Sequence, residues 1–200
     1  MLTLLILSAV ACQSKKSETD KSPETVSEVK QEGMMGRNLL EFPQIWEAAA
    51  DEYGSTFTEG EPFINDERLE VSFTIAKKEG DYYPYVELKS FPEVNYSEVN
   101  HISISYACAH GLTIKLNQSD FSAGGDESYA HYQYTLPATD GEPHTAVIAL
   151  SDFTQPDWAP EASRAIALNL ENILAIYFVP NIDYDKGEST TLTLYSVELN

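Results

Sequence analysis

The chain has 200 residues, a formal net charge of −20 and two cysteines. The length suggests one domain with a short appendage, and the charge disfavours nucleic acid as a partner, because an acidic domain is repelled by phosphate. Residues 37–200 carry 27 Asp/Glu against 8 Lys/Arg, so nearly all of the excess charge belongs to the expected domain. Cys108 is the only cysteine there, which excludes an internal disulfide, and no Cys/His cluster has the spacing of zinc ligands.

The chain begins with an apolar run, residues 2–11 (LTLLILSAVA), that ends just before Cys12. This run is too short to span a bilayer, which needs about 20 residues in a helix, but it matches the apolar core of a signal peptide. The run Ala9-Val10-Ala11-Cys12 resembles a bacterial lipobox, in which the cysteine becomes the acylated N-terminus. The alternative is an ordinary cleaved signal in which Cys12 is incidental. The lipobox interpretation places the protein in the bacterial cell envelope, at the outer membrane or cell surface, with the lipid anchor as its only membrane contact.

Residues 13–36 (QSKKSETDKSPETVSEVKQEGMMG) are polar and charged and contain no aromatic residue. Such a segment buries too little apolar surface to offset the entropy lost on folding, so we expect a flexible tether. A tether directly after an acylatable cysteine suits a module displayed on a surface. The expected organisation is therefore a signal peptide with lipobox over residues 1–12, a tether over 13–36 and one folded domain over 37–200.

Short apolar stretches separated by turn residues follow one another through the domain, a pattern typical of an all-β sandwich. The link Ala109-His110-Gly111 predicts a tight hairpin between two of the strands. Residues 41–50 (EFPQIWEAAA) are compatible with either a short helix or an opening strand. The candidate strands are residues 68–76, 83–90, 101–108, 112–118, 128–136, 144–150, 173–179 and 190–199.

Side chains alternate between the two faces of a strand, so the apolar phase of each stretch predicts the core. The residues expected to be buried are Ile104, Ile114, Leu116, Tyr134, Ile148, Ile176 and Phe178.

The opposite phase of three stretches places tyrosines among polar residues. If these strands share a sheet, its outer face suits a sugar, because pyranose C–H bonds pack on aromatic rings while hydroxyls pair with polar side chains. The alternative is that an antiparallel sheet exposes one polar face in any case and that Tyr is a favoured strand residue. The outward set includes Tyr83, Tyr85, Glu87, Lys89, Lys115, Tyr129, His131 and Gln133.

Four segments resemble those of galactose-binding-like β-sandwiches, in order and in spacing: residues 46–55 (WEAAADEYGS), 81–86 (DYYPYV), 150–158 (LSDFTQPDW) and 170–173 (LENI). The nearest family is the family 11 carbohydrate-binding modules, and the complex I assembly-factor family shares the sandwich. The likeness covers about residues 40–200.

This resemblance implies a jelly-roll β-sandwich of about eight to ten antiparallel strands, whose concave sheet holds a single glucan chain. It also implies a structural calcium ion, which takes several oxygen ligands. The last strand of the family commonly carries two Asp where this chain has residues 194–198 (LYSVE), so Glu198 is the only nearby candidate for the metal.

The function expected from these features is non-catalytic binding of a β-glucan or plant polysaccharide. Tyr83, Tyr85 and Tyr129 are expected to stack on sugar rings, and Glu87, Lys115 and His131 to pair with hydroxyls. No enzyme is expected, because no acid sits in a motif with a recognisable partner and no nucleophile elbow, phosphate loop or His-Glu-x-x-His is present. The alternative is a structural or assembly lipoprotein that docks another protein through the same sheet face.

Overall fold

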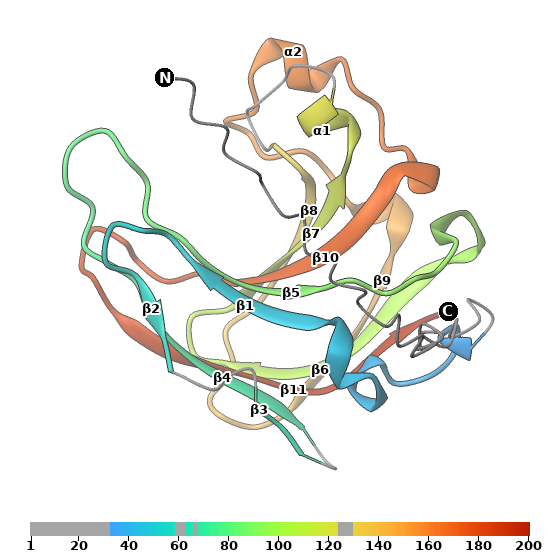
Figure 1. Ribbon diagram of the computed structural model, residues 1–200, viewed down its shortest axis with the longest axis horizontal. Helices are drawn as coiled ribbons and strands as arrows, with labels where there is room; N and C mark the ends of the chain where they lie inside the picture. Colours follow the sequence, from blue (N-terminus) through green and yellow to red (C-terminus); the bar gives the residue numbers. More distant parts are fainter. Residues whose placement is uncertain (1–32, 59–62, 66–67, 124–129) are drawn as a thin grey trace, which may run out of the picture.

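The computed structural model describes residues 33–58, 63–65, 68–123 and 130–200. These residues form two antiparallel sheets that lie one above the other (Figure 1). The first sheet has the order β1-β5-β10-β7-β8, and the second has the order β2-β4-β11-β6-β9 with β3 paired to β4. The prediction of an all-β sandwich is therefore confirmed.

Strands make up most of the regular structure of the described residues, and the helices are few and short. The strands of the first sheet are β1 (Trp46–Ala50), β5 (Val86–Ser90), β10 (Ile173–Pro180), β7 (Leu112–Gln118) and β8 (Tyr132–Leu136). Those of the second are β2 (Thr56–Phe57), β3 (Phe63–Ile64), β4 (Leu69–Thr74), β11 (Ser189–Leu199), β6 (His101–Cys108) and β9 (His144–Ala149). The α-helices are α1 (Asp120–Ala123) and α2 (Glu161–Arg164), and the 3₁₀-helices are η2 (Leu39–Glu41), η3 (Pro43–Ile45), η4 (Tyr96–Glu98), η5 (Leu150–Asp152) and η6 (Leu170–Asn172).

The core lies between the two sheets and is filled by alternate residues of each strand. In β5, for example, Val86 and Leu88 are buried whereas Glu87 and Lys89 are partly exposed. This alternation follows from the two-residue period of a strand. Of the expected core residues, six are almost fully buried: Ile104, Ile114, Leu116, Ile148, Ile176 and Phe178. Tyr134 differs, because it is only partly buried and packs against the edge of the core.

The link between β6 and β7 is not the expected hairpin. β6 pairs with β11 and β9 in the second sheet, whereas β7 pairs with β10 and β8 in the first, so residues 109–111 carry the chain from one sheet to the other. Gly111 has φ +78°, and a Cβ there would lie 2.9 Å from the carbonyl oxygen of Leu136. The glycine is therefore required by a crossing between layers.

The first folded segment resolves the open choice at residues 41–50. Residues up to Ile45 form short 3₁₀ turns, and Trp46–Ala50 is the opening strand, with Trp46 and Ala48 buried. The fold also begins slightly earlier than expected, because Met34 is buried and the Gly36 N–H donates to the Leu199 carbonyl at 2.9 Å. Cys12 and residues 1–32 lie outside the described residues. No helix within the described ranges is long and apolar enough to cross a membrane.

Candidate functional site

The outward face of the first sheet brings together residues from four strands. Tyr177 of β10 lies opposite Lys89 of β5 on one side and Lys115 of β7 on the other, and Lys115 lies opposite Gln133 of β8. Glu87 shares this phase in β5. The sequence correctly assigned the faces of these strands, but β10 lies between β5 and β7, which no local pattern indicated.

A pocket of about 390 Å³ opens at one end of this face. Its polar side chains come from Thr113, Lys115, Gln133 and Asn181. Three aromatic side chains also line it, and all three are exposed: Tyr85 (44%), Trp158 (64%) and Tyr184 (37%). The pocket thus combines ring faces accessible from solvent with hydrogen-bonding groups.

The topology explains why these three rings meet. β5 and β10 are antiparallel neighbours, so Tyr85 just before β5 and Tyr184 just after β10 lie at the same end of the sheet. Trp158 approaches from the other side, because Thr154 forms a bridge with Gln133 of β8 and carries the following residues along the sheet edge. Tyr85 and Tyr184 therefore approach the pocket from the ends of the inner strands β5 and β10, and Trp158 approaches it from the β8 edge.

Tyr85 is held by a buried carboxylate beneath it. Asp51 accepts hydrogen bonds from the backbone N–H groups of Tyr85 at 2.8 Å and Tyr53 at 2.7 Å. Burial opposes ionisation of Asp51, but the side chain of Ser55 and these backbone donors together hold its pKa below the ordinary value of 3.8. The backbone before β5 is thus fixed by a charged acceptor.

Tyr83 lies outside the pocket, at its rim. It is 63% exposed, and its ring meets that of Tyr184 edge to face with centroids 5.6 Å apart. The ammonium of Lys78 lies 3.6 Å from the centroid of the Tyr83 ring. The pKa of Lys78 is raised, and the largest cause is its side-chain hydrogen bond with Tyr83. Tyr83 and Tyr85 are thus both exposed near the pocket, as expected, but both precede β5 rather than lying in it, so the strand alternation does not explain their exposure, and only Tyr85 lines the pocket.

Lys115 and Glu87 form an ion pair on the same face. The Lys115 ammonium lies 3.2 Å from a Glu87 carboxylate oxygen, and the two side chains are 25% and 13% exposed. Lys115 lines the pocket, whereas Glu87 does not. Glu87 can therefore influence the pocket only indirectly, through its ion pair with Lys115.

His131 does not face solvent, and this expectation is wrong. It is 5% exposed, and its ring meets those of Phe121 at 5.5 Å and Tyr177 at 5.9 Å, both edge to face. The strand phase does point His131 outward, but Phe121 of α1, in the connection from β7 to β8, covers this end of the sheet. Burial first, and the charge of Lys115 second, lower the pKa of His131 to about 4. His131 is thus a neutral packing residue beneath the face.

Two other expected residues stay untested. Tyr129 lies outside the described residues. Glu198 lies opposite Ser103, and the described part of the chain holds no group of three or more His, Cys, Asp or Glu side chains placed to hold a metal ion. The calcium implied by the resemblance therefore stays a prediction.

Trp158 and Tyr184 were not among the expected site residues, because both lie in connections rather than in strands. Their context did carry a signal. Each is an aromatic residue among turn-forming and acidic neighbours, in residues 155–160 (QPDWAP) and 182–187 (IDYDKG). No strand phase directs such a ring into the core, and a large exposed ring in a connection is a candidate contact residue.

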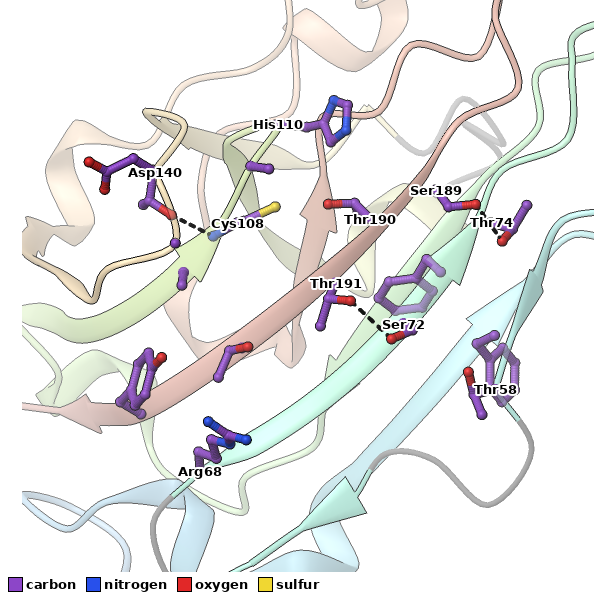
Figure 2. A pocket seen from close by; sticks show the side chains of 18 of the residues that line it. Thr58, Arg68, Ser72, Thr74, Cys108, His110, Asp140, Ser189, Thr190 and Thr191 are labelled. Atoms are coloured by element: carbon purple, nitrogen blue, oxygen red, sulfur yellow. Dashed lines mark hydrogen bonds between the residues drawn. The ribbon is translucent and has the colours of Figure 1, made fainter.

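A second, larger groove crosses the outward face of the other sheet (Figure 2). Its volume is about 1050 Å³, and hydroxyl groups dominate the part over β4 and β11. Several of these pair with one another, as Ser72 does with Thr191 at 3.0 Å and Thr74 with Ser189 at 2.8 Å. None of the large exposed apolar side chains of the described residues lines it. The rings of Phe57 and Tyr195 line this groove but are only partly exposed, unlike the three exposed rings of the first site.

No family model and no curated protein matches the sequence. A family 11 carbohydrate-binding module from Clostridium thermocellum, in complex with a beta-1,3-1,4-mixed-linked tetrasaccharide, is similar with a TM-score of 0.54 and 18% identity, over 78% of this chain and 88% of that one. The family 11 module of the cellulosomal cellulase Lic26A-Cel5E of the same organism has a TM-score of 0.47 and 18% identity, over 78% and 89%. A family 29 carbohydrate-binding module has a TM-score of 0.41 and 11% identity, over 80% and 82%.

The first of these similarities establishes the fold. The chain shares the β-sandwich fold of this family 11 carbohydrate-binding module. The resemblance noted in the four sequence segments is thereby confirmed at the level of architecture.

Proposed function

We propose that this protein binds a glycan without catalysis, at the pocket between Tyr85, Trp158 and Tyr184. The observation that carries the proposal is the presence of three exposed rings around polar side chains that can pair with hydroxyls. Sugar rings present C–H faces for stacking and hydroxyls for hydrogen bonding, so they match both components. The fold is shared by a module in complex with a beta-1,3-1,4-mixed-linked tetrasaccharide, which favours a β-glucan or a plant polysaccharide as ligand.

Affinity electrophoresis over a panel of polysaccharides tests this proposal. Replacing Trp158 or Tyr85 with Ala is expected to weaken binding by about two- to twelvefold, on the analogy of aromatic pairs worth roughly 0.5–1.5 kcal/mol beyond area. The melting temperature should change little, because both rings are exposed. Phe91→Ala is the matched control: this ring is 39% exposed, follows the opposite end of β5 and does not line the pocket.

Retardation of Phe91→Ala should equal that of the unmodified protein. If every glucan retards the Trp158 and Tyr85 variants as much as it retards the unmodified protein, this pocket is not the glycan site. The same aromatic face would then be better explained as a docking surface for another protein.

The proposal extends to a lipid anchor at Cys12 in the bacterial cell envelope. The first described residues support display of the pocket away from a membrane. The Gly36 N–H donates to the carbonyl of Leu199, the last residue of β11. The first residue of β11 is Ser189, which follows the pocket residue Tyr184 by five positions. Strands rise about 3.3 Å per residue, so roughly 30 Å separates the tether attachment from the pocket end. A domain anchored through Cys12 and the expected tether would present the pocket at the end far from the anchor.

Cys12→Ala is expected to release the protein from the membrane fraction or to leave it unprocessed. The physical reason is that removing the acylated sulfur removes the proposed membrane contact. Cell fractionation followed by mass spectrometry of the N-terminus measures the change. Cys108→Ala serves as the control, because that cysteine is buried in the sandwich. Equal partition of the Cys12→Ala and unmodified proteins would remove the anchor from the proposal.

A further inference from the structure

We propose that Glu87 sets the charge selectivity of the pocket: by neutralising Lys115, it lets the pocket accept uncharged glycans and reject glycans that carry carboxylates. This inference rests on the proposed glycan-binding function and concerns which class of glycan the site takes. Glu87 acts as a positioning residue, through the Lys115 ammonium.

The charge inventory of the pocket is short. Among its described lining residues, Lys115 alone carries a formal charge. Its ammonium lies 3.2 Å from the Glu87 carboxylate, and both side chains are largely buried, at 25% and 13% exposed. A close pair in a shielded environment interacts more strongly than a pair in bulk water, so the Lys115 charge is held toward β5 and away from a ligand.

The surroundings reinforce this effect. Burial first, and then the carboxylates of Glu87, Asp51 and Glu52, raise the pKa of Tyr85. Beyond the Glu87–Lys115 pair, Asp51 and Glu52 add negative charge beside the Tyr85 wall of the pocket, in a chain with a net charge of −20. A uronate ring placed there would lose hydration and meet no unpaired cation among the described lining residues, since the ammonium of Lys78 stays at the rim, 3.6 Å from the Tyr83 centroid and 5.8 Å from that of Tyr184. A neutral sugar ring would keep both of its favourable interactions with the pocket, because stacking on aromatic rings and hydrogen bonding through hydroxyls need no charge.

Removing the Glu87 charge should therefore change the preference of the pocket. Glu87→Gln keeps the length and a hydrogen-bond acceptor for Lys115 while freeing the positive charge to meet a ligand carboxylate. The matched control is Glu47→Gln, because Glu47 is an exposed acid of β1 on the same sheet, opposite Lys89 rather than near Lys115. The control removes the same formal charge without touching the ion pair. The double variant Glu87→Gln/Lys115→Gln removes both charges and restores a neutral pocket floor.

The probes are two forms of one glucan: the neutral oligosaccharide, and the same oligosaccharide after oxidation of its C6 hydroxyls to carboxylates. Calorimetry with the full-length protein measures both affinities. We expect Glu87→Gln to raise the ratio of oxidised to neutral affinity by about tenfold at low salt, and this gain should shrink as salt screens the charge. Glu47→Gln should leave the ratio near that of the unmodified protein, and the double variant should return to it.

An unchanged ratio in Glu87→Gln would overturn the inference, as would an unmodified protein that prefers the oxidised glucan. A gain confined to oxidised glucan in Glu87→Gln supports it, even where the unmodified protein binds the neutral form weakly. The proposed function is judged separately, by whether the unmodified protein binds the neutral glucan.

Discussion

Replacing Phe178 with Ala is expected to lower the free energy of unfolding by about 3–5 kcal/mol, because it leaves a large cavity in the centre of the sandwich. Phe178 is fully buried in β10, the central strand of the first sheet, and its ring centroid lies 5.6 Å from that of Trp46 in β1. Truncation removes the ring that packs against Trp46, and the surrounding strands can collapse only partly into the space left. Equilibrium unfolding in urea measures the loss.

Leu174→Ala is the matched control, since Leu174 lies in the same strand but is 55% exposed. Its effect should stay within roughly 0.5 kcal/mol, the size typical of surface substitutions. A loss below about 1 kcal/mol for Phe178→Ala would contradict the assignment of this β10 face to the core.

Lowering the pH from 6.5 to 4 is expected to cost the unmodified protein about 3 kcal/mol more unfolding free energy than it costs His131→Gln. Burial, with a smaller contribution from Lys115, lowers the pKa of His131 from the ordinary 6.5 to about 4 in the folded state. Between pH 6.5 and pH 4, His131 is protonated in the unfolded chain but stays neutral in the folded chain. The stability that the protein has with a neutral His131 is therefore complete above pH 6.5. It is lost progressively as the pH falls toward the folded-state pKa.

The measurement is a series of urea unfolding curves at fixed pH values, in which the two proteins are compared by slope rather than by absolute stability. The comparison is needed because many carboxylates titrate over the same range, and these titrations are common to both proteins. His144→Gln is the control, because His144 is exposed at the start of β9. Parallel pH profiles for the unmodified protein and His131→Gln would contradict the buried, neutral state of His131.

The period of two in the strands explains what could be predicted from the sequence. It assigned Ile114 and Leu116 to the core, and Lys115 to the outer face, without any knowledge of neighbours. Pairing between distant strands carries no such local signal. The position of β10 between β5 and β7 and the crossing at Gly111 both depend on which sheet each strand joins.

The remaining differences at the site also come from contacts made across connections. His131 has the phase of an exposed residue but is covered by Phe121, and nothing in the strand itself indicates this cover. Trp158 and Tyr184 have no strand phase, yet the ends of the sheet bring them to the pocket that Tyr85 lines. Local alternation therefore located the face, and long-range packing decided which side chains reach a ligand there.

Titration of the protein with a β-glucan oligosaccharide, followed by tryptophan fluorescence, tests the proposed site most directly. The chain has two tryptophans, of which Trp46 is buried and Trp158 is 64% exposed at the pocket. Stacking of a sugar on Trp158 should shift its emission to shorter wavelength in a saturable manner, and Trp158→Phe should abolish the shift. Saturable binding by calorimetry with no change in emission, or an unchanged shift in Trp158→Phe, would contradict a glycan site at this pocket.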